Sequence, residues 1–252
     1  MIRLLCLLAC AALAFGAEAL AAPQAVLGHD PAAAGQVRFA ELYTSEACAS
    51  CLPAEAAFAG LAARSHVVAL SFHVGYWDYL GWTDRFAIQA ATRRQWAYAR
   101  RLHGGEVFTP ELIMDGTVDG TGSDPGRIAR MMRMAKPIPE LRLSRGRNFV
   151  HVAVPALSGA AGAVLWVAAF DRQRIVKVGQ GENAGHVMRE VNIVRVADPV
   201  SRLGGTPAVI AVPAAPFGAH RGIAAFVQQP GSGPVLAAGM LPGPKSGGAA
   251  KP

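Results

Sequence analysis

The chain has 252 residues, of which 52% are hydrophobic and 16% are charged, and its formal net charge at pH 7 is +7. Beyond an N-terminal segment of roughly twenty residues, no apolar run is long enough to cross a membrane, so we expect no stable membrane insertion by the remainder. The arginines are spread along the sequence without regular aromatic interleaving, which argues against nucleic acid as a partner and favours a solvated basic surface.

Residues 1–21 have the organisation of an export signal. Arg3 supplies a basic start, Leu4–Phe15 a short apolar core, and Ala19-Leu20-Ala21 a small-x-small cleavage site. We therefore expect a cut after residue 21 and a periplasmic or secreted protein. Residues 22–35 have no periodic pattern and are predicted to form a flexible arm.

Two cysteines, Cys48 and Cys51, lie between a predicted strand, Val37–Tyr43, and an Ala-rich segment of helical character that ends near Arg64. Pro53 suits the first turn of this helix, where its missing N–H has no partner to lose. A strand that turns into a helix through Cys-x-x-Cys brings the first sulfur to the helix N-terminus. The unpaired N–H groups and the positive end of the dipole there favour a thiolate. This is typical of a dithiol/disulfide centre.

Signal removal would discard Cys6 and Cys10, so within one exported chain Cys48 and Cys51 can pair only with each other. An oxidising compartment favours that disulfide. A two-residue spacer closes a very small loop and stabilises the fold little, and a chain of this size does not need such a staple. A redox role is therefore favoured over a structural disulfide, with metal binding by the pair as a third alternative.

His66–Val74 is a near-continuous apolar run, which predicts a central strand covered on both faces, with His73 packed in the core. The next segment, Gly75–Phe86, is rich in aromatic residues and lies between this strand and a helix. Its rings either form a binding surface or fold inward over the core. The candidate binding residues of this loop are Tyr76, Trp77 and Trp82.

The following helix is predicted to begin at a Thr83 or Asp84 cap and to run to about Leu102, before the glycines that follow His103. A second candidate binding element, Thr109-Pro110, comes next. Proline lacks the N–H of a central strand, so it marks a strand's beginning. A Thr-Pro step one helix after a Cys-x-x-Cys suggests a cis peptide that faces the dithiol and pairs with an extended substrate; an ordinary trans proline is the alternative.

Asp115-Gly116 predicts a hairpin turn, and Asp124–Met134 a helix whose methionines belong to the core rather than to a copper site. The pattern changes at 136–139, where we place a domain boundary. Residues 138–240 then read as an antiparallel β-sandwich, and 241–252 as a disordered tail. The predicted strands are Leu141–Arg145, Phe149–Val154, Ala163–Asp171, Arg174–Val178, His186–Val196, Ala208–Val212, Gly222–Gln228 and Val235–Met240. Within this region Gly181–Gly185 predicts a hairpin turn, with Glu182 reaching either an arginine or the first domain as the alternative.

Several of these stretches together resemble the DUF1223 family of secreted bacterial proteins, which belongs to the thioredoxin-like superfamily. The stretches are Glu41–Ala54, Phe72–Trp82, Phe108–Gly116, Gly181–Asn183 and Asn192–Arg195. The resemblance implies export and a thioredoxin-like fold. With the strand pattern after residue 138, the prediction is an α/β protein in which a thioredoxin-like domain over 36–137 is followed by the β-sandwich domain. The resemblance implies no settled activity.

Thioredoxin-like proteins often keep a buried carboxylate beneath the dithiol as proton acceptor, and the resemblance puts Glu41 in that place. The mechanism we expect has Cys48 as nucleophile and Cys51 as resolving thiol, with Glu41 managing the proton. Thr109-Pro110 would hold the substrate chain. The expected partners are protein or peptide thiols and disulfides, with no cofactor and no bound metal.

Two other readings stay open at this point. In the first, the disulfide only shapes a loop, and the aromatic segment and the second domain bind an envelope partner. In the second, the two thiolates and a histidine such as His73 or His103 handle copper, although the spacing alone gives this little support.

Overall fold

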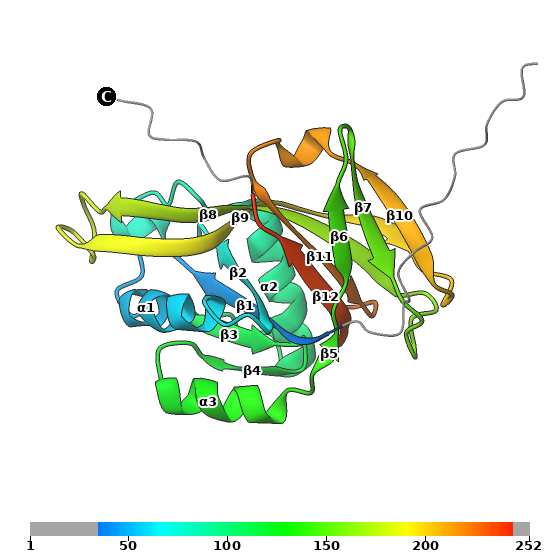
Figure 1. Ribbon diagram of the computed structural model, residues 1–252. Helices are drawn as coiled ribbons and strands as arrows, with labels where there is room; N and C mark the ends of the chain where they lie inside the picture. The colour runs from blue at the N-terminus through cyan, green and yellow to red at the C-terminus, as the bar shows by residue number, and fades with distance from the viewer. Residues whose placement is uncertain (1–34, 244–252) are drawn as a thin grey trace, which may run out of the picture. The chain divides into compact units, whose positions relative to one another are not determined.

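The computed structural model describes residues 35–243, in which three α-helices lie against a large mixed sheet beside a second, antiparallel sheet (Figure 1). The predicted signal segment, residues 22–34 of the predicted arm and residues 244–252 of the predicted tail lie outside the described residues. Between 35 and 243, no helix combines the length and the apolar character that a membrane crossing needs.

The first half of the described chain alternates strands and helices. Its elements are β1 (Gln36–Thr44), α1 (Cys51–Ala62), β2 (Val67–His73), the short 3₁₀ helix η2 (Asp78–Leu80), α2 (Gln89–Leu102), β3 (Glu111–Met114), β4 (Val118–Thr121) and α3 (Pro125–Met134). β1 is parallel to β2 and antiparallel to β3, which is antiparallel to β4. This part of the sheet therefore has the order β2-β1-β3-β4.

The two-residue period of β1 decides which helix each of its side chains meets. Ala40 and Leu42 pack with residues of α1 and α3, whereas Phe39 and Tyr43 pack on the other face with α2. β2 is buried at all seven positions, which confirms the central strand expected from its unbroken apolar run. The two helical layers thus lie on opposite faces of the sheet.

Local signals account for most of the element boundaries. The hairpin between β3 and β4 turns at Asp115 and Gly116, whose φ angles of 48° and 65° suit Asp and Gly in such a turn. Asp124 caps α3 by accepting a hydrogen bond from the Gly126 N–H at 2.8 Å. The cap predicted for α2 is wrong. α2 begins at Gln89, and the Asp84 carboxylate instead accepts hydrogen bonds from the N–H groups of Glu46 and Phe86.

The second half of the described chain is mainly β-structure. Its elements are β5 (Ile138–Pro139), β6 (Arg142–Arg145), β7 (Phe149–Val154), β8 (Val164–Lys177), β9 (Val187–Arg202), β10 (Ala208–Pro213), the 3₁₀ helix η3 (Ala215–Phe217), β11 (Gly222–Gln228) and β12 (Val235–Leu241). Two separately predicted strands, 163–171 and 174–178, form the single strand β8.

These strands do not all build a sheet of their own. β9 runs parallel to β2 at Ser71 and Ile193, so one sheet runs in the order β12-β11-β8-β9-β2-β1-β3-β4. The second sheet, β10-β7-β6, shares a hydrophobic cluster with β8, β11 and β12. The chain after residue 138 thus extends the first sheet and also covers part of it, and the β8–β9 hairpin reaches beside α1 (Figure 1).

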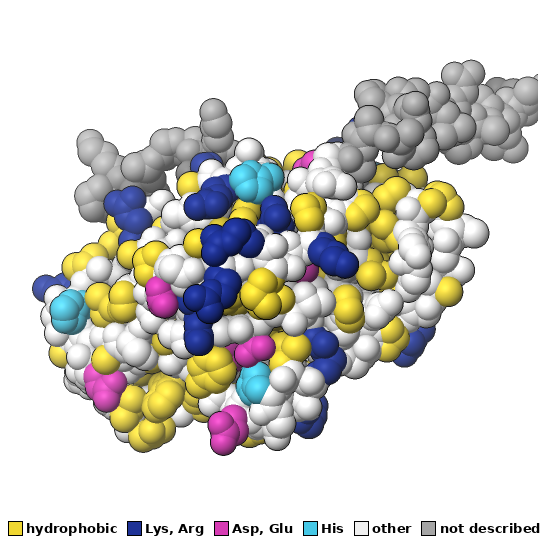
Figure 2. Space-filling view, turned by 90° about the horizontal axis from the view of Figure 1, so that it is seen from below, with side chains coloured by type: hydrophobic (Ala, Val, Ile, Leu, Met, Phe, Trp, Pro, Cys, Tyr) yellow, Lys and Arg dark blue, Asp and Glu magenta, His cyan; other side chains and the backbone are white. Residues whose placement is uncertain are grey.

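The positive charge lies partly on α3. Arg127, Arg130 and Arg133 recur every three residues along this helix and are exposed. Figure 2, which views the molecule from the α3 side, shows Lys and Arg side chains in a band among hydrophobic and uncharged groups. Part of the positive charge therefore lies on an exposed helical face.

Candidate functional site

Cys48 and Cys51 are joined by a disulfide at the point where β1 gives way to α1. Cys51 is the first residue of α1 and is completely buried, whereas 4% of Cys48 is exposed, beside the exposed Ala49 and Ser50. The Cys51 N–H donates to the Cys48 carbonyl at 3.1 Å, which closes the turn into the helix. Cys48 is therefore the half of the pair that lies nearer to solvent, as predicted for a nucleophile.

The Thr109-Pro110 peptide is cis, and it faces the disulfide as predicted. The Thr109 hydroxyl donates to the Cys48 sulfur at 3.1 Å. The Ser50 hydroxyl in turn donates to the Thr109 carbonyl at 3.3 Å. β3 begins immediately after Pro110, so this proline does mark the start of a strand.

The aromatic segment surrounds the same point. The Trp77 indole N–H donates to the Thr109 hydroxyl at 2.8 Å, and the Trp82 indole N–H donates to Glu46 at 2.5 Å. The Tyr76 hydroxyl donates to Gln95 at 3.1 Å, while Tyr79 is 76% exposed. Trp77 and Trp82 thus direct their indole N–H groups to residues beside the dithiol, Tyr76 bonds to α2, and all three rings stay partly exposed.

Glu41 is not brought to the dithiol. Its carboxylate is completely buried between the Arg94 guanidinium, at 2.6 and 3.1 Å, and the Tyr98 hydroxyl at 2.6 Å, and both partners belong to α2. Cys51 lies on α1, which covers the opposite face of the sheet. The prediction that Glu41 lies beneath the dithiol is therefore wrong. Residues 39, 41 and 43 of β1 all point to the α2 face, whereas residues 40 and 42 point to the α1 face.

A group of buried ionisable side chains lies where Glu41 was expected. Its centre is the His73–Asp84 pair, joined at 2.8 Å with neither side chain exposed. Burial alone would lower the pKa of His73, but the Asp84 carboxylate raises it to about 9. Burial works to raise the pKa of Asp84, and the charge and hydrogen bond of His73 outweigh it and lower that pKa. The pair is therefore charged at neutral pH.

Glu46, Glu55 and Glu190 complete this group, which we call the buried acidic cluster together with His73 and Asp84. Burial raises the pKa of all three glutamates, and raises that of Glu190 to about 8. One oxygen of Glu46, one of Glu55, both of Glu190 and Nε2 of His73 have no hydrogen-bond partner. Buried polar atoms without partners are rare, so this gathering indicates a functional or hydrated interior.

Glu55 is the member of the cluster that shares helix α1 with Cys51. It is 3% exposed and stands four residues after Cys51, so both side chains lie on one face of α1. Its Oε1 accepts from the Thr44 hydroxyl at 2.7 Å, and its Oε2 is free. The i, i+4 spacing from Cys51 is the sequence signal that could have identified it.

A loop from the second half of the chain completes the wall of the site. The Asn183 amide donates to the Glu46 carbonyl at 2.9 Å and to the Cys48 carbonyl at 3.0 Å. Glu182 accepts from the Ala49 N–H at 3.3 Å. The segment forms the predicted turn, between β8 and β9, and its Glu182 also reaches the first part of the chain. Asn183 holds the cysteine turn although it lies far from it in sequence.

The cluster predicts how stability depends on pH. Glu190 has a pKa of about 8 in the folded chain against an ordinary value of 4.5, so the folded state holds a proton that the unfolded state releases above about pH 4.5. The contribution of His73 is complete below pH 6.5 and is lost as the pH rises through about 9. The free energy of unfolding should therefore fall between about pH 5 and pH 9, measured by urea denaturation.

Glu190→Gln removes the titration of Glu190 and leaves that of His73. The free energy of unfolding of this variant should therefore fall less steeply with pH below about pH 8. The pKa of Asp84 is lowered, so its contribution is lost only on acidification below its ordinary value of 3.8, outside this window. A free energy of unfolding that rises over the window, or a Glu190→Gln profile parallel to that of the unmodified chain, would contradict the assignment.

Comparisons with known proteins place these residues in a wider group. A family model described as "Protein of unknown function (DUF1223)" matches residues 39–228, which include both cysteines, the aromatic segment and Asn183. The crystal structure of protein AGR_C_4864 from Agrobacterium tumefaciens is similar, with a TM-score of 0.72 and 28% sequence identity. The similarity covers 87% of this chain and 100% of that one. No match is found among the curated proteins.

Proposed function

We propose, from the premise that this chain belongs to the DUF1223 family, that it is an exported thiol–disulfide oxidoreductase. The observation that carries the proposal is the Cys48–Cys51 disulfide beside the cis Thr109-Pro110 step, with the Thr109 hydroxyl 3.1 Å from the Cys48 sulfur. A purely structural role explains the disulfide less well. The loop that it closes is too small to stabilise the fold much, and a chain with a core of this size does not need a disulfide to fold.

The proposal includes a thioredoxin-like arrangement for the first half of the described chain. Its support is the element order β1-α1-β2-α2-β3-β4-α3, the strand order β2-β1-β3-β4, and helices on both faces. In this arrangement the cysteines follow the carboxyl end of β1, where ligand sites of open α/β sheets are found. The second half, for which a β-sandwich was expected, contributes Asn183 to the site and a further sheet to the core.

The proposed reaction begins from the reduced pair. The Cys48 thiolate attacks one sulfur of a substrate disulfide, so a Cys48–substrate bond forms and the other substrate sulfur leaves as a thiolate. Cys51 then attacks Cys48, which reforms the protein disulfide and releases the second substrate sulfur. Two electrons pass to the substrate in total, and the same steps in reverse oxidise a substrate dithiol.

Each neighbour has a part in these steps. The Thr109 hydroxyl, already directed at Cys48, favours the thiolate by donating a hydrogen bond to it. Glu55 accepts the proton that Cys51 must lose, in place of Glu41, because it is buried one helical turn away with a free oxygen. A carboxyl group whose pKa is raised by burial is suited to exchange a proton near neutral pH.

The substrates we propose are protein or peptide thiols and disulfides. Thr109-Pro110 lies against Cys48, and the partly exposed rings of Tyr76, Trp77 and Trp82 lie on the loop whose Trp77 bonds to Thr109. Together they offer both hydrogen bonds and apolar contact to an extended chain. The export predicted from residues 1–21 would place this exchange in the periplasm or outside the cell, where substrate disulfides persist.

A redox titration of the Cys48–Cys51 pair tests the proposal. Catalytic pairs have potentials between about −270 and −120 mV, whereas structural disulfides lie below about −300 mV. We expect a value within the catalytic range, measured by equilibration with glutathione or dithiothreitol buffers and thiol alkylation. A potential well below about −300 mV would mean that no physiological donor reduces the pair, and the disulfide would then be structural.

A further inference from the structure

A second group of side chains, which does not include the cysteines, lies at the C-terminal end of α2. His103 follows the last residue of α2, Glu111 is the first residue of β3, and Asp119 lies in β4. In the β3–β4 ladder Glu111 pairs with Thr121, so Asp119 is its diagonal neighbour on the same face of the hairpin. Three elements thus bring one imidazole and two carboxylates together.

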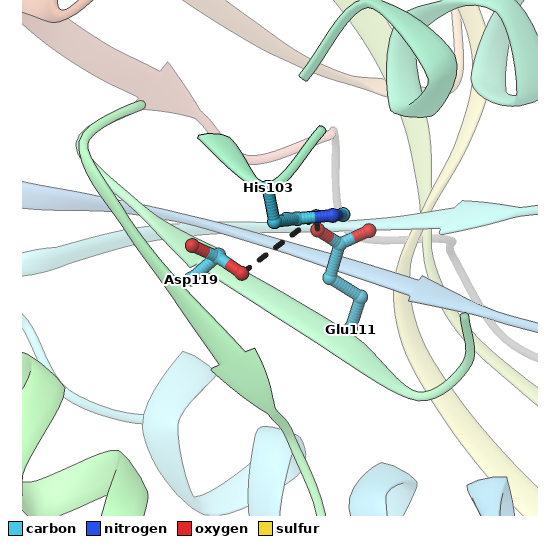
Figure 3. A group of neighbouring side chains, drawn as sticks. All are labelled: His103, Glu111 and Asp119. Atoms are coloured by element: carbon cyan, nitrogen blue, oxygen red, sulfur yellow. Dashed lines mark hydrogen bonds and ion pairs between the residues drawn. The ribbon is translucent and has the colours of Figure 1, made fainter. Parts of the chain in front are cut away.

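The three groups point at one another (Figure 3). His103 Nε2 lies 3.2 Å from Glu111 Oε1 and 3.7 Å from Asp119 Oδ2. One ligand atom from each residue lies within 4.8 Å of the other two. A single ring nitrogen carries at most one proton and can donate to only one of these oxygens, so an imidazole by itself does not satisfy both carboxylates.

The charges favour a cation among them. Two carboxylates on one face of a hairpin repel each other, and Glu111 is completely buried. The donor that binds the second oxygen of Glu111 is the neutral amide of Gln95, at 2.8 Å, and not a guanidinium or ammonium group.

A supporting shell is also present. Gln95 donates from Nε2 to Glu111 Oε2 and to the Phe108 carbonyl, both at 2.8 Å, and so fixes the orientation of the carboxylate. Metal-binding carboxylates are held by such outer contacts. His103 and Asp119 are 22% and 24% exposed, which leaves a path from solvent to the three ligand atoms.

We propose that His103, Glu111 and Asp119 form a binding site for a first-row divalent metal ion, with Zn²⁺ as the best match. One imidazole nitrogen and two carboxylate oxygens are a ligand set that zinc accepts, and three protein ligands leave a fourth, tetrahedral position on the exposed side. The proposal does not depend on thiol–disulfide exchange. It places a metal next to the Thr109-Pro110 turn, since Glu111 directly follows Pro110.

Zinc binding by the chain tests this assignment directly. The untagged chain, with its disulfide intact so that no thiolate competes, is freed of metal by chelation and then equilibrated with Zn²⁺ by dialysis. We expect one zinc per chain by elemental analysis, and a rise in the thermal unfolding midpoint with zinc concentration. His103→Ala and Asp119→Asn should each weaken binding by about 10-fold or more, because the loss of outer contacts alone costs 10–100-fold.

His186→Ala is the matched control, because His186 is exposed and distant from the three ligands in sequence, and it should bind zinc like the unmodified chain. Circular dichroism without metal verifies that the variants are folded, and Asp119→Asn retains the shape of the side chain if His103→Ala does not fold. Failure of the unmodified chain to bind zinc would overturn the proposal. So would equal binding by Asp119→Asn, or retention of Ca²⁺ or Mg²⁺ in preference to Zn²⁺.

Discussion

Cys48→Ala is expected to reduce insulin-type disulfide exchange to the uncatalysed background. The substitution removes the sulfur that forms the mixed disulfide, and Cys51 cannot replace it, because Cys51 is completely buried at the start of α1. The fold should persist, since the lost bond closes only a two-residue loop. The measurement is the rate of insulin reduction with dithiothreitol as electron donor, with the unmodified chain assayed in parallel.

Cys51→Ser is the matched control, because it keeps the attacking sulfur and removes only the resolving one. It should accumulate a covalent mixed disulfide between Cys48 and the substrate, visible by mass spectrometry and released by reductant. Cys48→Ala should form no such adduct. Exchange that survives in Cys48→Ala would contradict the proposed function, and a binding activity kept by a Cys48→Ser/Cys51→Ser variant would favour a binding module.

Local patterns were sufficient to predict most of the elements and part of the site. The unbroken apolar run of β2, the helix predicted over Asp124–Met134 and the turn at Asp115 each depend on neighbouring residues, and each is found within one residue of where it was expected. The Thr109-Pro110 step also follows from its place after a Cys-x-x-Cys and one helix. Apart from the Thr109-Pro110 step, these features are local in sequence, so one chain is enough to identify them.

The features that were missed depend on how distant segments meet. The period of β1 shows that residues 39, 41 and 43 share a face, but not that α2, rather than α1, covers it. Asn183 hydrogen-bonds to the Glu46 and Cys48 carbonyls across more than 130 residues, although its own surroundings indicate only a turn. The pairing of β9 with β2 was likewise missed, because the predicted domain boundary near residue 137 puts these two strands in different domains.

The buried position of Glu41 leads to the largest expected effect on stability. Arg94→Met removes the guanidinium that holds this carboxylate and leaves it without a countercharge in the core, so the free energy of unfolding should fall by about 3–5 kcal/mol. Methionine keeps much of the side-chain volume that packs against Phe226 and Trp166, at 4.8 and 5.2 Å from the guanidinium carbon. Urea denaturation at neutral pH measures the loss.

Arg93→Met is the matched control, since Arg93 is the exposed neighbour on the same helix and donates only to Gln89; it should change stability by no more than about 0.5 kcal/mol. The double variant Glu41→Leu/Arg94→Met removes both charges and should be more stable than Arg94→Met alone, because no buried charge is then left unpaired. An Arg94→Met variant no less stable than Arg93→Met would contradict the assignment of a buried ion pair to the stability of the core.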